Sequence, residues 1–184
     1  MNYLGNATNF LSQAILGFAL YVVLLRFWMQ WVRADFRNPV GQFVIAVTNP
    51  VVIPLRKVLP SIGAVDTATV VLAMVVAVCK IYVFFGLRGG TPDLISLASI
   101  SLGEAVLFSI HIFIAAIFIK IIASWINPHG FHPIVSLAHS IAEPIMAPAR
   151  RIIPPIGGLD LSPILVLLFL NLTIMLVVYP LKGF

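Results

Sequence analysis

Charged residues are scarce in this sequence. Asp, Glu, Lys and Arg together make up 9% of its 184 residues, whereas 61% are hydrophobic. About a quarter of the residues of a soluble domain are charged, so this chain has too few charges to cover a surface that faces water. The scarcity excludes an ordinary soluble domain and predicts an integral membrane protein.

Acidic residues are scarcer than basic ones, 6 against 11, which gives a formal net charge of +5. The basic residues flank apolar runs and do not form one long patch. We therefore expect the chain to be attracted to anionic lipid headgroups and to bind no nucleic acid.

Cysteine and the common catalytic motifs are also nearly absent. The single cysteine, Cys79, excludes a disulfide framework and a Cys-rich metal site within one chain. The sequence contains no GxSxG elbow, no P-loop and no HExxH motif. We expect a protein without catalytic residues or cofactors, and not an enzyme.

Long apolar runs dominate what is present. A helix needs about 20 residues to cross a bilayer, and four runs reach that length: about Leu11–Val32, Thr67–Leu87, Glu104–Ile126 and Leu161–Leu181. They predict an all-α membrane protein with four transmembrane helices in a single membrane domain over residues 1–184. The apolar, serine-containing stretch Pro92–Leu102 either lengthens the third helix or lies at the interface.

A proline-rich box occurs twice, 94 positions apart without a gap, as Asn49–Asp66 and Glu143–Asp160. Each copy is preceded and followed by one apolar run, so both copies should enter the membrane from the same side. This predicts two parallel two-helix repeats, related by an axis along the membrane normal. The expected units are residues 11–87 as repeat one, 88–104 as a connector and 105–181 as repeat two.

Each long loop has the same predicted plan. Asn38 and His132 precede a proline, which is typical of a helix start. The segments Val40–Thr48 and Ile134–Ala142 follow; they are too short to span the membrane and fit interfacial or re-entrant helices. Each should end at the next proline.

The box itself should be a rigid elbow, because its prolines forbid a long regular helix and its first glycine permits a turn back into the membrane. Its structural residues are Pro50, Pro54, Pro60, Gly63 and Asp66 in the first copy, and Pro144, Pro148, Pro154, Gly157 and Asp160 in the second.

Basic residues set the expected orientation. The two long loops hold six of them against two on the opposite side, which places both loops in the cytoplasm and both termini outside. The six are Arg33, Arg37, Arg56, Lys57, Arg150 and Arg151, and the two are Arg88 and Lys182.

Two adjacent basic pairs, Arg56-Lys57 and Arg150-Arg151, are the strongest candidates for binding. They would bind lipid phosphates or dock an acidic protein partner. Arginine occupies the first position of both pairs, which favours a geometry that uses its guanidinium fork.

Asp66 and Asp160 open the second and fourth spans. They would cap these helices, form salt bridges to Arg56 or Arg150, or do both.

Polar residues inside apolar runs are a second group of candidates. Arg26 and Lys120 occupy equivalent positions and would extend to the headgroups, or else line an ion path or pair with the box aspartates. Lys80 should extend outward. Asn171 should hydrogen-bond between helices or line a polar path, and His111 should form an interhelical hydrogen bond.

A metal site is a weaker alternative. The second loop holds His129, His132 and His139, with Glu143 four residues after the last of them. This spacing is loose, and Pro144 would disturb a helix at Glu143, so we predict no metal site.

The doubled pattern P-x3-P-x-R-[RK]-x2-P, followed by I-G-[AG]-[VL]-D, resembles the YggT/YlmG family of small bacterial and plastid membrane proteins. The match covers almost the whole chain. The residue before the first proline differs between copies, Asn49 against Glu143, and we assign it no role. The resemblance implies a bacterial inner membrane or thylakoid location. It also implies links to osmotic tolerance, to division or nucleoid placement, and to assembly of a membrane cytochrome, with no agreed biochemical activity.

The sequence thus favours a non-catalytic inner-membrane organiser or assembly factor. Its basic elbows would bind anionic lipid and an unidentified membrane or cytoplasmic protein, and homo-oligomers would cover its apolar surface. The alternative is an ion channel or transporter that contributes to the osmotic stress response. The sequence leaves open the partner, any transported species, and the number of subunits.

Overall fold

The computed structural model describes residues 3–126, 132–153 and 160–183. Apart from one isolated bridge between Ile62 and Val65, the regular structure in these ranges is helical, so the predicted all-α class is confirmed. The helices are α1 (Tyr3–Trp31), α2 (Pro39–Val58), α3 (Thr67–Gly86), α4 (Leu94–Ile126), α5 (Pro133–Ile152), α6 (Ser162–Thr173), the π-helical turn η1 (Ile174–Val178) and α7 (Tyr179–Lys182).

Four helical segments of the described chain are long and apolar enough to cross a membrane: α1, α3, α4 and the run Ser162–Lys182. They coincide with the four predicted spans. The third begins at Leu94, so most of the stretch that the sequence left open lengthens α4. Asp93 fixes this start, because its carboxylate accepts hydrogen bonds from the backbone N–H groups of Ile95 (3.1 Å) and Ser96 (3.0 Å).

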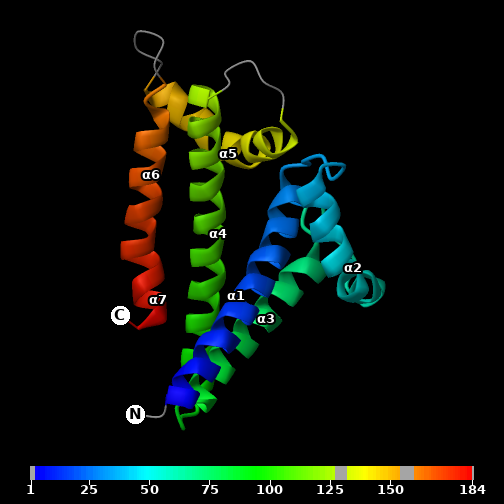
Figure 1. Cartoon of the computed structure of the whole chain (residues 1–184), viewed down its shortest axis with the longest axis vertical. Helices are drawn as coiled ribbons and strands as arrows, with labels where there is room; N and C mark the ends of the chain where they lie inside the picture. Colours follow the sequence, from blue (N-terminus) through cyan, green and yellow to red (C-terminus); the bar gives the residue numbers. More distant parts are fainter. Residues whose placement is uncertain (1–2, 127–131, 154–159, 184) are drawn as a thin grey trace.

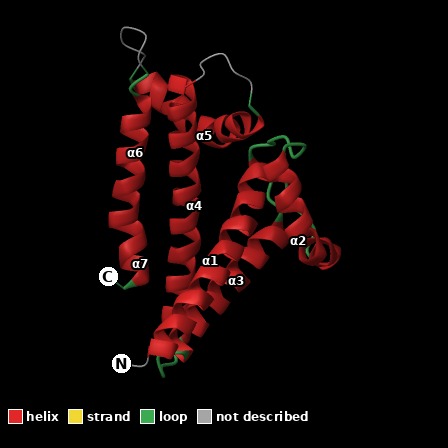
Figure 2. Cartoon of the chain, viewed as in Figure 1, coloured by secondary structure: helices red, strands yellow, loops and turns green. Residues whose placement is uncertain are grey.

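The spans form two hairpins, α1 with α3 and α4 with α6 and α7, as Figures 1 and 2 show. Both termini lie at the same end, which we call the terminal end; there the hairpins meet. Toward the opposite end, which we call the box end, they splay apart (Figure 1). Helix α2 packs on the first hairpin at the box end, and α5 packs on α4 and α6.

The core lies between the helices and uses small side chains where they approach. Leu20, Met29 and Ile117 are fully buried, and Ala73 and Ala77 of α3 face neighbouring helices. Helices in lipid associate through close packing, which explains the small residues. Large apolar side chains also cover the outside of the spans, where they would face lipid tails; examples are Phe10, Ile15, Phe169 and Leu176.

Helices α2 and α5 correct the predicted plan of the loops. Each runs through two prolines without interruption, α2 through Pro50 and Pro54 and α5 through Pro144 and Pro148. The predictions that the short helices end at Thr48 and Ala142, and that the prolines forbid a long helix, are therefore wrong.

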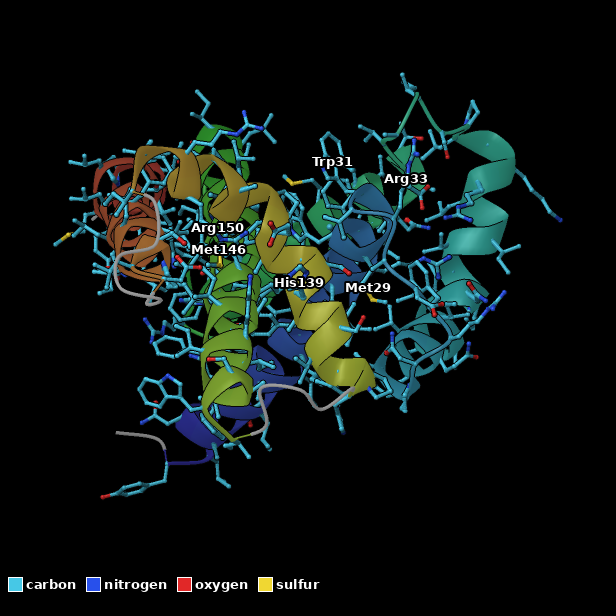
Figure 3. All side chains as sticks on the ribbon, turned by 90° about the horizontal axis from the view of Figure 1, so that it is seen from above. Met29, Trp31, Arg33, His139, Met146 and Arg150 are labelled. Carbon is cyan, nitrogen blue, oxygen red and sulfur yellow. The ribbon has the colours of Figure 1, made fainter. Side chains whose placement is uncertain are left out.

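Packing explains why the prolines do not break these helices. A proline removes one backbone hydrogen bond, and two prolines four positions apart lie on one face, so the helix bends instead of ending. Figure 3 shows the bend in α5. Val52, between the prolines of α2, is fully buried, and Met146, between those of α5, is 1% exposed. Each helix is thus anchored where its backbone is weakest.

The predicted helix starts are confirmed. The Asn38 side chain accepts the N–H of Gly41 (2.8 Å), and the His132 ring accepts the N–H of Ile134 (3.3 Å).

Gly63 has φ +59°, the left-handed conformation that the turn after Pro60 requires. Pro154 and Gly157 lie outside the described residues. The bounds of α2 and α5 differ by 94 positions at both ends, 39 to 133 and 58 to 152.

Candidate functional site

The box segments place polar side chains into two clusters at the box end. We call them the first box cluster (Arg26, Gln30, Thr48, Asn49, Arg56, Asp66 and Thr69) and the second box cluster (Lys120, His139, Glu143, Arg150, Asp160 and Ser162). The first joins α2 to the hairpin of α1 and α3, and the second joins α5 to α4 and α6.

Arg56 and Asp66 form the central pair of the first box cluster. Arg56 Nη2 lies 2.5 Å from Asp66 Oδ2, and its Nε donates to the same oxygen at 3.2 Å. Thr69 donates its hydroxyl to Asp66 (2.5 Å). The Gln30 side chain lies between the carboxylate and the guanidinium, and with its amide nitrogen turned toward Asp66 it would donate to Asp66 and accept from Arg56. The salt-bridge interpretation of Asp66 is confirmed. The capping interpretation is wrong, because the Asp66 side chain accepts no backbone N–H of α3.

Arg26 lies behind this pair and is 4% exposed. Its Nη1 donates to Thr48 Oγ1 (2.5 Å) and to Asn49 Oδ1 (2.8 Å), both on α2. Arg26 thus fastens α2 to α1, and the prediction that it extends to the headgroups is wrong. Among the described residues it has no carboxylate within ion-pair distance, and its Nε has no hydrogen-bond partner.

Arg150 is the centre of the second box cluster. Its Nη1 and Nη2 donate to the two oxygens of Glu143 (2.8 and 2.9 Å), and its Nε donates to Asp160 (3.2 Å). This fork requires arginine, as the sequence predicted from the first position of each pair. Asp160 also accepts the N–H of Ser162 at the start of α6 (3.0 Å), so the salt-bridge and helix-start roles coexist there.

Lys120 faces the same carboxylate. Its Nζ lies 3.4 Å from Glu143 Oε2, so it contacts α5, and its extension to the headgroups stays a prediction. Glu143 is a residue whose role the sequence interpretation missed. The available signal was its position seven residues before Arg150, two helical turns along one face of α5.

The two box clusters differ in charge because Asn49 stands where the second copy has Glu143. The first contains Arg26 and Arg56 against Asp66, two positive charges against one negative. The second contains Lys120 and Arg150 against Glu143 and Asp160, two against two. With His139 neutral, the first box cluster therefore carries one more positive charge than the second.

Hydrogen bonding and burial shift the pKa values of the acidic residues in both clusters. Hydrogen bonds from Arg150 lower the pKa of Glu143, aided by the charge of Lys120. Burial alone would raise the pKa of Asp66, but hydrogen bonds from Arg56 and Thr69 bring it below its ordinary value. Burial opposes the lowering of the pKa of Asp160 in the same way, and hydrogen bonds from Ser162 and the charge of Arg150 outweigh it.

These shifts predict how stability depends on pH. A carboxylate with a lowered pKa stabilises the fold fully above its unfolded pKa of about 4, and this contribution is lost as the pH falls through the lower folded pKa. We expect the unfolding midpoint in detergent to be flat between about pH 7 and 5 and to fall below about pH 4. Glu143→Gln should reduce this acid dependence. An equally steep fall in that variant would show that Glu143 is not one of the groups responsible.

The second member of each basic pair is placed differently from the first. Lys57 and Arg151 are exposed and form no ion pair with any described residue. Arg56 and Arg150 instead hold the chain together. All four residues were binding candidates from the sequence, and in the structure the first member of each pair bonds within the protein while the second is exposed.

The remaining candidates have mixed outcomes. His111 Nδ1 lies 3.1 Å from the Tyr21 hydroxyl, which confirms the predicted interhelical hydrogen bond. Asn171 is exposed and donates to the carbonyl of Leu167 in its own helix (2.8 Å), so its predicted interhelical role is wrong.

His139 Nε2 lies 3.6 Å from Glu143. No three potential metal ligands converge within the described ranges, and His129 lies outside them.

A third cluster joins the two hairpins at the terminal end and was missed. Glu104 on α4 pairs with Lys80 on α3 (2.7 Å) and with Lys182 on α7 (2.6 Å). Glu104 is 5% and Lys80 8% exposed, so the prediction that Lys80 extends outward is wrong. The available signal was that Glu104 is the single acidic residue between Leu94 and Ile126.

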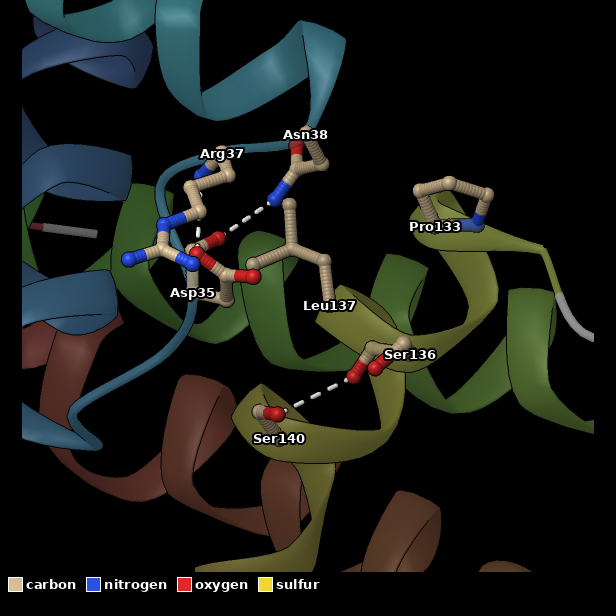
Figure 4. Close-up of a pocket in the computed structure, with 7 residues that line it drawn as sticks. All are labelled: Asp35, Arg37, Asn38, Pro133, Ser136, Leu137 and Ser140. Carbon is tan, nitrogen blue, oxygen red and sulfur yellow. Dashed lines mark hydrogen bonds between the residues drawn. The ribbon is translucent and has the colours of Figure 1, made fainter.

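Figure 4 shows a small pocket at the box end where the loop after α1 faces α5. It has a volume of about 180 Å³ and lies between Asp35, Arg37 and Asn38 on one side and Ser136 and Ser140 on the other. The polar groups drawn bond within their own segments: Arg37 N to Asp35 (2.9 Å) and the Ser140 hydroxyl to the Ser136 carbonyl (3.0 Å). The pocket is therefore a gap between the first and second halves of the chain. The polar side chains that line it do not converge on a common point.

Comparison with known proteins identifies a family and several relatives. The model of the CCB3/YggT family matches residues 5–87 and again residues 100–181. An uncharacterized protein of Pseudomonas aeruginosa is 37% identical over 180 residues, which cover 95% of this chain and 90% of that one. A Vibrio alginolyticus protein encoded in the proC 3′ region is 40% identical over 91% of this chain and 90% of its own length.

The uncharacterized protein YggT of Escherichia coli strain K12 is 35% identical over 90% of this chain and 86% of its own length. No solved structure matches the chain. The doubled family match over most of the chain, together with these relatives, shows that the protein belongs to the CCB3/YggT family.

Proposed function

We propose that this chain is a non-catalytic organiser or assembly factor of the bacterial inner membrane, which binds anionic lipid and a protein partner at its box end. The observation that carries the proposal is the pair of exposed cations, Lys57 and Arg151, in the last turns of α2 and α5. The box clusters fix these turns against the spans, so each cation is held in place on its own hairpin.

The amphipathic character of α2 supports an interfacial position. One face is buried, with Val44 1% exposed, while Phe43, Val47 and Val51 on other faces are about half exposed although they are apolar. A helix with exposed apolar side chains and a basic last turn suits the boundary between headgroups and acyl chains. The same reasoning applies to α5, where Ile152 is exposed beside Arg151.

The proposed orientation follows from the same charges. Basic residues favour the cytoplasmic side of a membrane protein, so the box end would face the cytoplasm and both termini the outside. The equal offset of α2 and α5 supports two parallel two-helix repeats, each with its own elbow. Exposed apolar surface on the spans would be covered by lipid, by a protein partner or by a second copy.

A lipid-binding assay tests this proposal. The double variant Lys57→Gln/Arg151→Gln should lose its preference for phosphatidylglycerol over phosphatidylcholine by about 30-fold, since each cation near an anionic surface contributes about 1 kcal/mol. Native mass spectrometry of protein titrated with the two lipids in detergent measures the preference.

Lys182→Gln is not a suitable control for this experiment, because Lys182 pairs with Glu104. Arg88→Gln removes an exposed cation from the terminal end and leaves the box end intact. An unchanged preference in the double variant, or an equal loss in Arg88→Gln, would contradict a lipid-binding role for the box end.

The buried cluster of Lys80, Glu104 and Lys182 favours the alternative function, an ion channel or transporter, because ionisable groups inside a membrane often mark ion paths. In this structure Glu104 pairs with Lys182 at 2.6 Å and with Lys80 at 2.7 Å, an arrangement that is equally suited to holding the hairpins together. Liposomes that contain the protein and pass K⁺ down an imposed gradient would favour the alternative.

A further inference from the structure

We propose that the first half of the chain, and not the second, holds the phosphate of one anionic phospholipid whose acyl chain lies in an apolar crevice between the two hairpins. This inference rests on the proposed lipid-binding function and assigns a specific site to it. Three observations carry it: a hollow lined by cations, an uncompensated buried charge beside that hollow, and an apolar crevice that shares two of its walls.

The hollow lies at the first box cluster and has a volume of about 500 Å³. Arg33, Arg56 and Gln30 contribute donors to its wall, and Gly63 and Ala64 form the part of the wall that lies in the turn. Asp66 also lines it, but this carboxylate is occupied by Arg56 and Thr69. The hollow therefore presents mainly donors, as a phosphate requires.

The charge balance favours an anion at this cluster. Arg26 is buried and, among the described residues, lacks a carboxylate partner, which leaves the first box cluster with one positive charge in excess. A buried charge without a counter-ion is costly, and an anion nearby would reduce that cost. In the second box cluster Glu143 supplies the missing negative charge from within the protein.

Arg33 adds a cation that the second half does not match. It lies two residues after the end of α1 with φ +53°, a left-handed conformation that is unusual for a residue other than glycine. The N–H groups of Arg33 and Ala34 donate to the carbonyls of Gln30 (3.1 Å) and Met29 (2.8 Å), and these bonds close the helix end and hold the conformation. The residue 94 positions later in the sequence is Asn127, which tolerates this conformation but carries no charge; it lies outside the described residues.

The crevice runs between the hairpins and has a volume of about 350 Å³. Helices α1 and α3 line one side of it with Leu24, Phe27 and Ala73, and α4 lines the other with Ala105 and Phe113. Its lining is almost entirely apolar, and the hairpins that form it splay apart toward the box end (Figure 1). In a membrane the apolar groups available to fill such a space are acyl chains.

The hollow and the crevice are neighbours along α1 and α3, because residues in or next to both helices line each of them. On α1, Phe27 in the crevice lies three residues before Gln30 in the hollow. On α3, Val70 in the crevice lies four residues after Asp66 in the hollow. These spacings are about one helical turn, or about 5 Å of axial rise, so an amphiphile with its phosphate in the hollow would begin its acyl chain at the mouth of the crevice.

Fluorescence quenching by brominated lipids tests the site. Trp28 lines the crevice, so a protein with Trp31→Phe and Trp125→Phe reports on it alone. In nanodiscs, phosphatidylglycerol with brominated acyl chains should quench Trp28 more strongly than phosphatidylcholine with the same chains at equal mole fraction. Arg33→Asn should reduce this difference about fivefold, without lowering the unfolding midpoint. Arg88→Asn, which removes an exposed cation at the terminal end, should leave the difference intact.

Further arms of the experiment separate the two parts of the proposal. Ala105→Phe should fill the crevice and reduce quenching by both lipids, and its unfolding midpoint shows that the variant is folded. Inorganic phosphate added in excess should not abolish the lipid difference, because it lacks an acyl chain. Complete competition by phosphate, or equal effects of Arg33→Asn and Arg88→Asn, would overturn the site. If Lys57→Gln/Arg151→Gln loses the lipid preference and Arg33→Asn does not, the proposed function stands and this inference is wrong.

Discussion

Replacing Glu104 with glutamine is expected to destabilise the protein by about 3–5 kcal/mol, since breaking a buried ion pair from one side leaves a buried charge uncompensated. Glu104 is 5% exposed and is the carboxylate shared by Lys80 and Lys182. It also joins the hairpin of α1 and α3 to that of α4 and α7, so its loss should loosen the terminal end. Unfolding in mixed micelles, followed by far-UV circular dichroism, measures the change.

The matched control is Asp93→Asn, an acid-to-amide change at the exposed residue that precedes the same helix. Asparagine still caps a helix, so this variant should differ from the wild type by well under 1 kcal/mol. Adding Lys80→Met to Glu104→Gln should restore part of the stability, because an apolar residue removes one of the uncompensated charges. A loss below about 1 kcal/mol for Glu104→Gln would show that the cluster is hydrated and does not hold the hairpins together.

The two box arginines are expected to differ in their effect on stability, although they occupy equivalent positions. Arg56→Gln should cost about 3 kcal/mol, because it leaves Asp66, whose side chain is 6% exposed, without its cation. Arg150→Gln should cost about 1 kcal/mol or less, because the side chains of Glu143 and Asp160 are 34% and 36% exposed and water can solvate them. The unfolding midpoints of both variants in detergent provide the comparison.

Lys57→Gln and Arg151→Gln are the neighbouring controls. Both side chains are exposed and unpaired within the described chain, so neither change should alter the midpoint measurably. If Arg150→Gln proves as destabilising as Arg56→Gln, the second box cluster is more shielded from water than the burial of its acids indicates. The same set of variants separates stability from lipid preference, which should follow Lys57 and Arg151.

This division changes how the basic pairs are interpreted. The sequence placed Arg56, Lys57, Arg150 and Arg151 together as one binding surface. In the structure the arginine that comes first in each pair forms a salt bridge that closes the loop, and the second residue faces outward. The reason is helical geometry: adjacent residues on a helix point about 100° apart, so only one of them can face the spans.

Arg26 and Asn171 show why intramembrane polar residues were hard to interpret from the sequence. Both lie within apolar runs, and an apolar run on all sides of a helix does not indicate which neighbour each of its faces contacts. Arg26 faces α2 and is buried, whereas Asn171 is exposed and bonds to its own backbone. Since α2 was expected to end at Thr48, the partners Thr48 and Asn49 could not be assigned to Arg26 in advance.

Composition and local pattern determined the membrane class, the four spans, the helix starts at Asn38 and His132, and the turn at Gly63. These features depend on the preferences of short segments for lipid, for a cap or for a left-handed backbone. The tertiary structure alone decided that α2 and α5 continue through their prolines, that Arg26 is buried against α2, and that Glu104 pairs with a lysine 78 positions away. Those outcomes depend on which helix faces pack against each other, and this packing joins segments that are far apart in the chain.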